Sequence, residues 1–168
     1  MALTTKLNVS LSAVQTAAKD LTTVRAPLDY AKALILGSGT AAGQADQLWS
    51  DTRTIAASGT DPLDLAGSLI DALGTTLTFA RVKGLIVVAA AANVNDVVIG
   101  GAASNTFTGP FVDATDKLKV RPGGVLALFA PAATGYPVTA STGDQLLIAN
   151  SGGTTSVTYD VVIIGASA

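Results

Sequence analysis

The sequence predicts an all-β protein, a jelly-roll-like antiparallel β-sandwich with an N-terminal strand or arm region. Short apolar segments recur along the chain, and Gly, Pro, Asn and Asp residues typical of turns separate them. Every acidic side chain is Asp and none is Glu, which favours caps and turns over helix interiors. No repeat of fixed period is present, so neither a propeller nor a solenoid is expected. We divide the chain into an N-terminal strand or arm region with a Gly-rich connector, residues 1–43, and a β-sandwich domain, residues 44–168.

The N-terminal region begins with a predicted strand. Residues 3–11 alternate between apolar and polar side chains, as a half-buried strand does. Two placements are open to this strand: it is the first strand of its own domain's sheet, or it adds to the edge of a neighbour's sheet. Residues 13–26 are expected to form a loop with at most one or two helical turns, because Pro27 disfavours helix just before it. Residues 28–36 predict a second strand, and residues 37–46 a flexible connector.

The strongest strand signal in the chain lies at residues 77–101. We expect two apolar strands here, joined into a hairpin by a turn at residues 93–96. Residues 85–90 are apolar at every position, which predicts a strand buried on both faces. Residues 69–74 are predicted to form one helical turn, and residues 151–155 a second hairpin turn. The remaining predicted strands span residues 63–69, 117–120, 125–130, 145–150 and 157–165.

The composition points to a surface that is covered in the working state of the protein. Charged side chains make up only 13% of the chain, against a typical fraction of about 25%. A lone soluble protein normally carries a more charged surface. We therefore expect a homo-oligomer, with a trimer favoured over a dimer, whose surface is covered by copies of itself or by other proteins.

Two classes of partner are not expected. The net charge of −2 and the scattered Lys and Arg residues predict no nucleic-acid partner. The longest apolar run, residues 85–92, is too short to span a bilayer, which predicts no membrane partner. Residues 1–15 lack the apolar segment of a signal peptide, so we expect synthesis in the cytosol.

The residue types needed for common catalytic and metal sites are missing. The chain contains no His and no Cys, which removes the commonest general base, the commonest metal ligand and the thiolate nucleophile. Asp61 precedes Pro62 and is interpreted as a turn residue rather than as half of a catalytic pair with Asp64. Asp113 and Asp116 could hold a cation, but a solvated turn is the favoured interpretation. We therefore predict no enzyme activity, no cofactor, and no catalytic, cofactor-binding or metal-binding residue.

Six residues are candidates for contacts with a partner. Trp49 is the only Trp, and two interpretations of it stay open: a sugar-stacking platform with Asp51 as a hydrogen-bonding partner, or a buried anchor at a domain or subunit contact, which we favour. Asp51 and Arg53 share one face if this segment is a strand, so these two side chains could pair. The loops at residues 101–116 and 131–138 supply three apolar anchors, Phe107, Phe111 and Tyr136.

Four segments carry a resemblance to a known group of proteins. They read QADQLWSDTRTIAASGTDPLDLAGSLIDALGTTLTFARVKGLIVVAAAANVNDVVIGGAAS, PGGVLALFAP, TGDQLLIANSGG and TYDVVIIGASA. This part of the chain, from about Gln44 to Ala168, resembles small structural proteins encoded by tailed bacteriophages. The resemblance implies a non-enzymatic role in the virion, assembled in the host cytoplasm, and it carries over no functional residues.

The low charge and the apolar strands favour one place in such a virion. We expect a capsid decoration protein, of the cement or head-fibre type, that oligomerises and binds the major capsid protein on the outer surface of the head. The alternative is a tail or baseplate component with a receptor- or glycan-binding role, for which Trp49, Asp51 and Arg53 would form the binding cluster.

Overall fold

The structure is a computed structural model that describes residues 2–168, and this range contains strands and turns but no helix. Its strand pairs are antiparallel apart from the short pair β2–β3. The prediction of an all-β protein is therefore confirmed. The strands are β1 (Thr5–Ala18), β2 (Thr23–Ser38), β3 (Gln44–Ala45), β4 (Gln47–Ile55), β5 (Thr60–Asp64), β6 (Arg81–Ala89), β7 (Val97–Gly100), β8 (Lys117–Val120), β9 (Val125–Phe129), β10 (Tyr136–Pro137), β11 (Gln145–Asn150) and β12 (Val157–Ala166).

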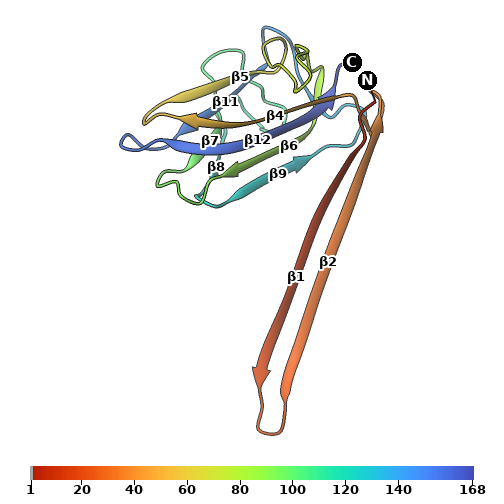
Figure 1. Ribbon diagram of the computed structural model, residues 1–168, viewed down its shortest axis with the longest axis vertical. Coiled ribbons are helices and arrows are strands. Elements are labelled where there is room, and N and C mark those ends of the chain that lie inside the picture. The colour runs from red at the N-terminus through yellow and green to blue at the C-terminus, as the bar shows by residue number, and fades with distance from the viewer. Residues whose placement is uncertain (1) are drawn as a thin grey trace.

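Figure 1 shows two parts of very different shape. A long hairpin made of β1 and β2 extends away from a body that contains the later strands. We call the hairpin, residues 5–38, the arm, and residues 44–168 the body. The C-terminus lies near the root of the arm (Figure 1).

The body consists of two sheets that pack face to face. One sheet has the order β10-β6-β12-β4, and β9 also pairs with β6 on the side where β10 lies. The other sheet has the order β5-β11-β7-β8. Alternate residues of each strand enter a shared core, as in β12, where Tyr159, Val161 and Ile163 are buried. Leu146 and Ile148 of β11 meet them from the opposite sheet. Each such buried aliphatic side chain contributes about 1.5–3 kcal/mol, so this core carries most of the stability of the body.

Neither predicted hairpin of the body is formed. β6 and β7 belong to opposite sheets, and so do β11 and β12. The loops at residues 93–96 and 151–155 cross from one sheet to the other and bind each other, since Asp96 N donates to Ser151 Oγ at 2.9 Å and Asn95 Nδ2 to the Thr155 carbonyl at 3.0 Å. Consecutive strands in a two-sheet body cover the core from opposite sides, and the sequence pattern alone does not distinguish this from a hairpin.

Strand β6 is buried on one face more than on the other. Leu85 and Val87 lie in the core between the sheets, whereas Ile86 and Val88 are half-buried on the outer face. The prediction of full burial on both faces is therefore wrong. The outer face is covered only where the root of the arm lies on it, near Ile86.

The expected loop at residues 13–26 is also wrong, because most of this segment is strand. β1 and β2 pair in one unbroken register from Thr5 opposite Leu36 to Ala18 opposite Thr23. Only residues 19–22 turn, closed by a hydrogen bond from Lys19 N to the Thr22 carbonyl at 2.8 Å. The helical spacing of Ala13 and Ala17 also places both on one face of a strand, since a separation of four residues fits both periods, while Leu21 lies in the turn.

Two further local predictions fail. Residues 69–74 form no helical turn; Asp71 Oδ1 instead accepts the backbone N–H groups of Leu73 and Thr75, at 2.9 and 2.8 Å, and Ile70 bridges to Thr76. Asp61 is not a turn residue, because it lies within β5 and pairs with Ile148 of β11. Pro62 is tolerated there because β5 is an edge strand.

Candidate functional site

The arm has one apolar and one polar face. Residues directly opposite each other in an antiparallel pair share a face, so the register assigns every arm residue to one side. Leu11 opposite Tyr30 and Ala13 opposite Leu28 lie on the first face, while Ser10 opposite Ala31 lies on the second. We call the first the apolar face: it consists of Thr5, Leu7, Val9, Leu11, Ala13, Gln15, Ala17, Val24, Ala26, Leu28, Tyr30, Lys32, Leu34 and Leu36. The polar face carries Lys6, Asn8, Ser10, Ser12, Thr16, Arg25 and Asp29 among its residues.

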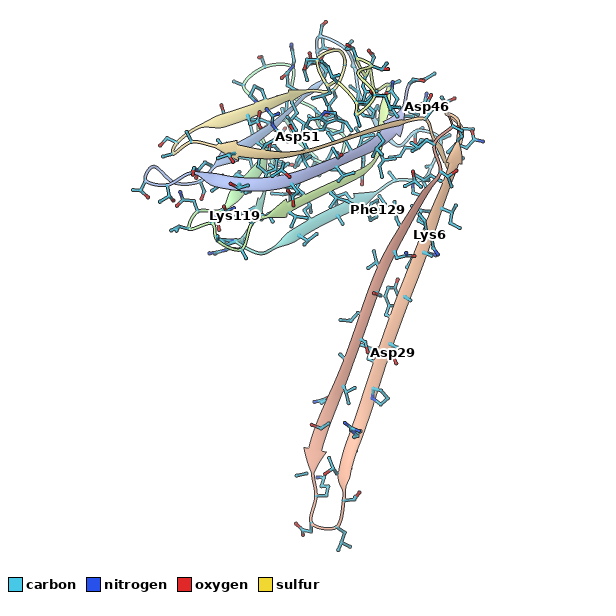
Figure 2. The ribbon with its side chains drawn as sticks, in the orientation of Figure 1. Lys6, Asp29, Asp46, Asp51, Lys119 and Phe129 are labelled. Carbon is cyan, nitrogen blue, oxygen red and sulfur yellow. The ribbon has the colours of Figure 1, made fainter. Side chains whose placement is uncertain are left out.

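No part of residues 2–168 covers this apolar face beyond its root. All residues from 8 to 33 are exposed, and Leu11 and Tyr30 keep 54% and 56% of their surface in solvent. Figure 2 shows the side chains of the arm standing clear of the body, with Asp29 well away from it and Phe129 beside its root. A free two-stranded hairpin is at best marginally stable in water. An exposed apolar face of this extent is typical of a surface that binds another molecule.

The total exposed area supports the same conclusion. The chain exposes 9105 Å². Size scaling gives roughly 7,600 Å² for a compact monomer of 16.7 kDa, so the excess is about 1,500 Å². A stable protein interface takes about 800 Å² from each partner. The arm thus offers enough surface for a full interface.

The root of the arm is fixed firmly to the body. Leu7 and Leu36 form a small second core with Ile164, and Phe129 packs against it. The buried Lys83 donates from Nζ to the Ala41 carbonyl at 2.6 Å, which ties the connector between arm and body to β6. Burial lowers the pKa of Lys83, and the nearby charge of Arg81 lowers that pKa further. These contacts set the direction in which the arm leaves the body.

A network of charged side chains joins the two sheets where their edge strands β4 and β5 lie. Arg53 of β4 binds Asp61 of β5 through two N–H groups, Nε to Oδ2 and Nη2 to Oδ1, the second at 2.7 Å. Tyr159 donates its hydroxyl to Asp61 Oδ2 at 2.7 Å, and Arg53 Nη1 also reaches Asp51 Oδ2 at 3.0 Å. The interpretation that Asp51 and Arg53 share a face and pair is confirmed, but the stronger partner of Arg53, Asp61, was missed. An open depression of about 320 Å³ lies over these residues.

The pKa shifts within this network are those of charged groups that hold two strands together. Burial alone would raise the pKa of Asp61, but hydrogen bonds from Arg53 and Tyr159 outweigh it and hold that pKa below its ordinary value. Burial raises the pKa of the Tyr159 hydroxyl, and its bond to Asp61 raises it further. The hydrogen bond to Asp61 likewise raises the pKa of Arg53. At neutral pH Arg53 and Asp61 are therefore both charged. Their hydrogen bonds, together with that of Tyr159, connect β4, β5 and β12.

The aromatic candidates lie mostly inside the body. Trp49 is only 6% exposed and belongs to the main core, so its ring is not available to stack on a sugar. Phe107 is also buried in this core, while Phe111 and Tyr136 are half-buried and pack against it. Asp51 is exposed and belongs to β4, an edge strand of its sheet.

The acidic loop at residues 112–116 is closed by its own backbone. Asp113 accepts bonds from Thr115, and Asp116 accepts the N–H groups of Val112 and Asp113. Hydrogen bonds from Thr115 lower the pKa of Asp113. Across residues 2–168 no three Asp side chains gather as a metal site would require. The same residues include no helix long and apolar enough to cross a membrane.

The sequence prediction missed that the apolar face runs unbroken along the whole arm and is exposed. Its signal is present, because the alternation that begins at Leu7 continues through Ala17 and resumes from Val24 to Leu36.

Comparison of the chain with protein-family models, with curated proteins and with solved structures finds no match.

Proposed function

We propose that this chain is a non-enzymatic structural protein of a tailed-bacteriophage virion, a capsid decoration protein that self-associates and binds the outer surface of the head. The observation that carries the proposal is the arm, a rigidly rooted hairpin with an exposed apolar face. Such an arm fastens a body to an assembly, because burying it supplies the free energy that the isolated chain lacks. The body, with its own core, is then displayed to solvent.

We further propose that the body is a jelly roll. In that fold the first of eight strands pairs with the eighth, the second with the seventh, the third with the sixth and the fourth with the fifth, and the pairs wrap into two sheets. Leaving aside the two-residue strands β3 and β10, the body supports this with four antiparallel pairs, β4–β12, β5–β11, β6–β9 and β7–β8.

Binding to heads that lack decoration tests the proposed function. Purified wild-type protein is mixed with undecorated heads and sedimented, and we expect it to pellet with the heads at a saturating, fixed ratio. The double variant Leu11→Lys with Tyr30→Lys places two charges on the apolar face and should reduce binding by at least tenfold. The double variant Ser10→Lys with Ala31→Lys is the matched control, since it adds the same charges one position away on the polar face.

Failure of the wild type to pellet with heads at micromolar concentration would refute the decoration role. The alternative, a tail or baseplate component with a receptor- or glycan-binding role, predicts binding to purified tails or to host glycans instead. The burial of Trp49 removes the aromatic platform that motivated the glycan role.

A further inference from the structure

A groove lies at the root of the arm, between its apolar face and the body. It has a volume of about 210 Å³, and its lining is almost wholly apolar apart from one cation. The residues that line it are Leu7, Val9, Lys32, Leu34, Phe129 and Pro131. From this groove the exposed apolar face continues outward along the arm through Leu11 and Tyr30. A molecule that covers the face would therefore also fill the groove.

Lys32 is the only charged residue on the apolar face. No carboxylate of the described chain lies within ion-pairing distance of its Nζ. A cation at the rim of an apolar groove favours an occupant that combines apolar side chains with a carboxylate. The same charge disfavours packing the arms of two copies face to face in parallel, since their Lys32 side chains would then approach each other.

The distribution of charge selects a second copy as the occupant. Residues 1–43 carry four cations, Lys6, Lys19, Arg25 and Lys32, and two acids, Asp20 and Asp29, so their side chains sum to +2. Residues 44–168 carry six cations and ten acids, so their side chains sum to −4. The arm of one copy is therefore complementary in charge to the body of another.

One loop of the body has the chemistry that the groove requires. Residues 70–73 project two exposed apolar side chains, Ile70 and Leu73, the second 69% exposed, on either side of Asp71. The loop is held in shape, because Asp71 Oδ1 accepts two backbone N–H groups and Ile70 bridges to Thr76. A preformed loop loses little conformational entropy when it binds.

We infer that the groove at the root of the arm receives the loop at residues 70–73 of a second copy of this chain, with Leu73 in the groove and Asp71 paired with Lys32. The inference deepens the proposed self-association and rests on it. In this arrangement the arm of one copy contacts the body of the next, and the two arms do not contact each other. Each copy binds its neighbour through the groove on one side and the loop at residues 70–73 on the other.

The test measures the self-association of the full chain for two matched surface variants. Leu73→Lys and Val112→Lys both replace an exposed apolar loop residue, 69% and 99% exposed, so that neither disturbs the core. Leu73→Lys should raise the dissociation constant of the assembly at least tenfold, because it brings a second cation to Lys32 and loses an apolar contact. Val112→Lys should leave the constant within about twofold of wild type. Sedimentation equilibrium over a range of concentrations gives both values.

A zero-length carbodiimide cross-link identifies the partner residues. In an equal mixture of ¹⁴N- and ¹⁵N-labelled full chains, we expect a light–heavy peptide pair that joins Lys32 to Asp71, and we expect Asp71→Asn to abolish it while Asp113→Asn does not. An assembly in which Lys32 links to another acid, or in which Leu73→Lys and Val112→Lys behave alike, overturns this inference and leaves self-association standing. A wild-type chain that stays monomeric at every concentration overturns both.

Discussion

Removal of the Asp61 carboxylate should destabilise the body by about 3 kcal/mol. In Asp61→Ala, the Tyr159 hydroxyl is left as a buried donor without a partner, which costs about 1–3 kcal/mol. The Arg53 side chain is 35% exposed and keeps Asp51 as a partner, so it can rehydrate, and its lost bonds add only about 1 kcal/mol. For a chain of this size the sum corresponds to a fall in Tm of roughly 6–12 °C.

Urea denaturation at pH 7, followed by circular dichroism, measures this loss. Asp160→Ala is the matched control, because Asp160 is an exposed carboxylate on β12 whose bond to Thr52 lies in solvent, and it should change the free energy of unfolding by less than about 0.5 kcal/mol. Tyr159→Phe removes the buried donor with its bond and should cost about 1 kcal/mol. An Asp61→Ala variant as stable as the Asp160→Ala control would refute the assignment of the network as a tie between the sheets.

The pH dependence of the same network has a definite sign. The pKa of Asp61 is lower in the folded chain than its ordinary value of 3.8, so the folded state binds the proton less readily than the unfolded state. The contribution of Asp61 to the free energy of unfolding is complete above pH 3.8. It is lost as the pH falls through the lower pKa that Asp61 has in the folded chain. The difference in unfolding free energy between wild type and Asp61→Asn should therefore shrink below about pH 4.

Three further predictions concern β6, Lys83 and the arm. Val87→Asp should unfold the body and Val88→Asp should leave it folded, because only Val87 faces the core; circular dichroism separates the two, and equal unfolding would contradict the burial. Wild type should gain stability relative to Lys83→Met as the pH rises toward 10.5, since burial lowers the folded pKa of Lys83 and the unfolded state then binds more protons; a difference that does not change with pH would contradict the lowered pKa. Trypsin should cut after Lys19 and Arg25 in dilute protein and much more slowly in concentrated protein, whereas equal rates would show that the arm stays uncovered.

Several strands of the body could be predicted from the sequence because buried and exposed residues alternate along them, but β4 was expected only conditionally and most of β5 was interpreted as a turn. The alternation in β11 and β12 marks them clearly, and the turns between strands follow from Gly, Pro, Asn and Asp. The pairing of the strands could not be predicted, since β6 and β7 look alike whether they form a hairpin or face each other across the core. Pairs such as β4–β12 join segments about a hundred residues apart, and local pattern carries no information on them.

The candidate site was predicted less well than the fold. Asp51 and Arg53 are two residues apart on one strand, so their pairing follows from strand geometry alone. Asp61 joins them only because β4 and β5 lie in opposite sheets at one edge of the body. An N-terminal arm region with strands at residues 3–11 and 28–36 was predicted, but the length of the hairpin was missed, because the small residues at 13–18 fit a helix as well as a strand and a hairpin exposed on both faces is not expected of a single chain.

We propose above all that the apolar face of the arm is buried in an assembly of this chain. The most direct test is the solution mass of three proteins at equal concentration: wild type, Leu11→Lys with Tyr30→Lys, and Ser10→Lys with Ala31→Lys. We predict a multiple of 16.7 kDa for the wild type and for the polar-face variant, and 16.7 kDa for the apolar-face variant. A wild-type mass of 16.7 kDa, or a full-sized assembly of the apolar-face variant, would contradict the claim.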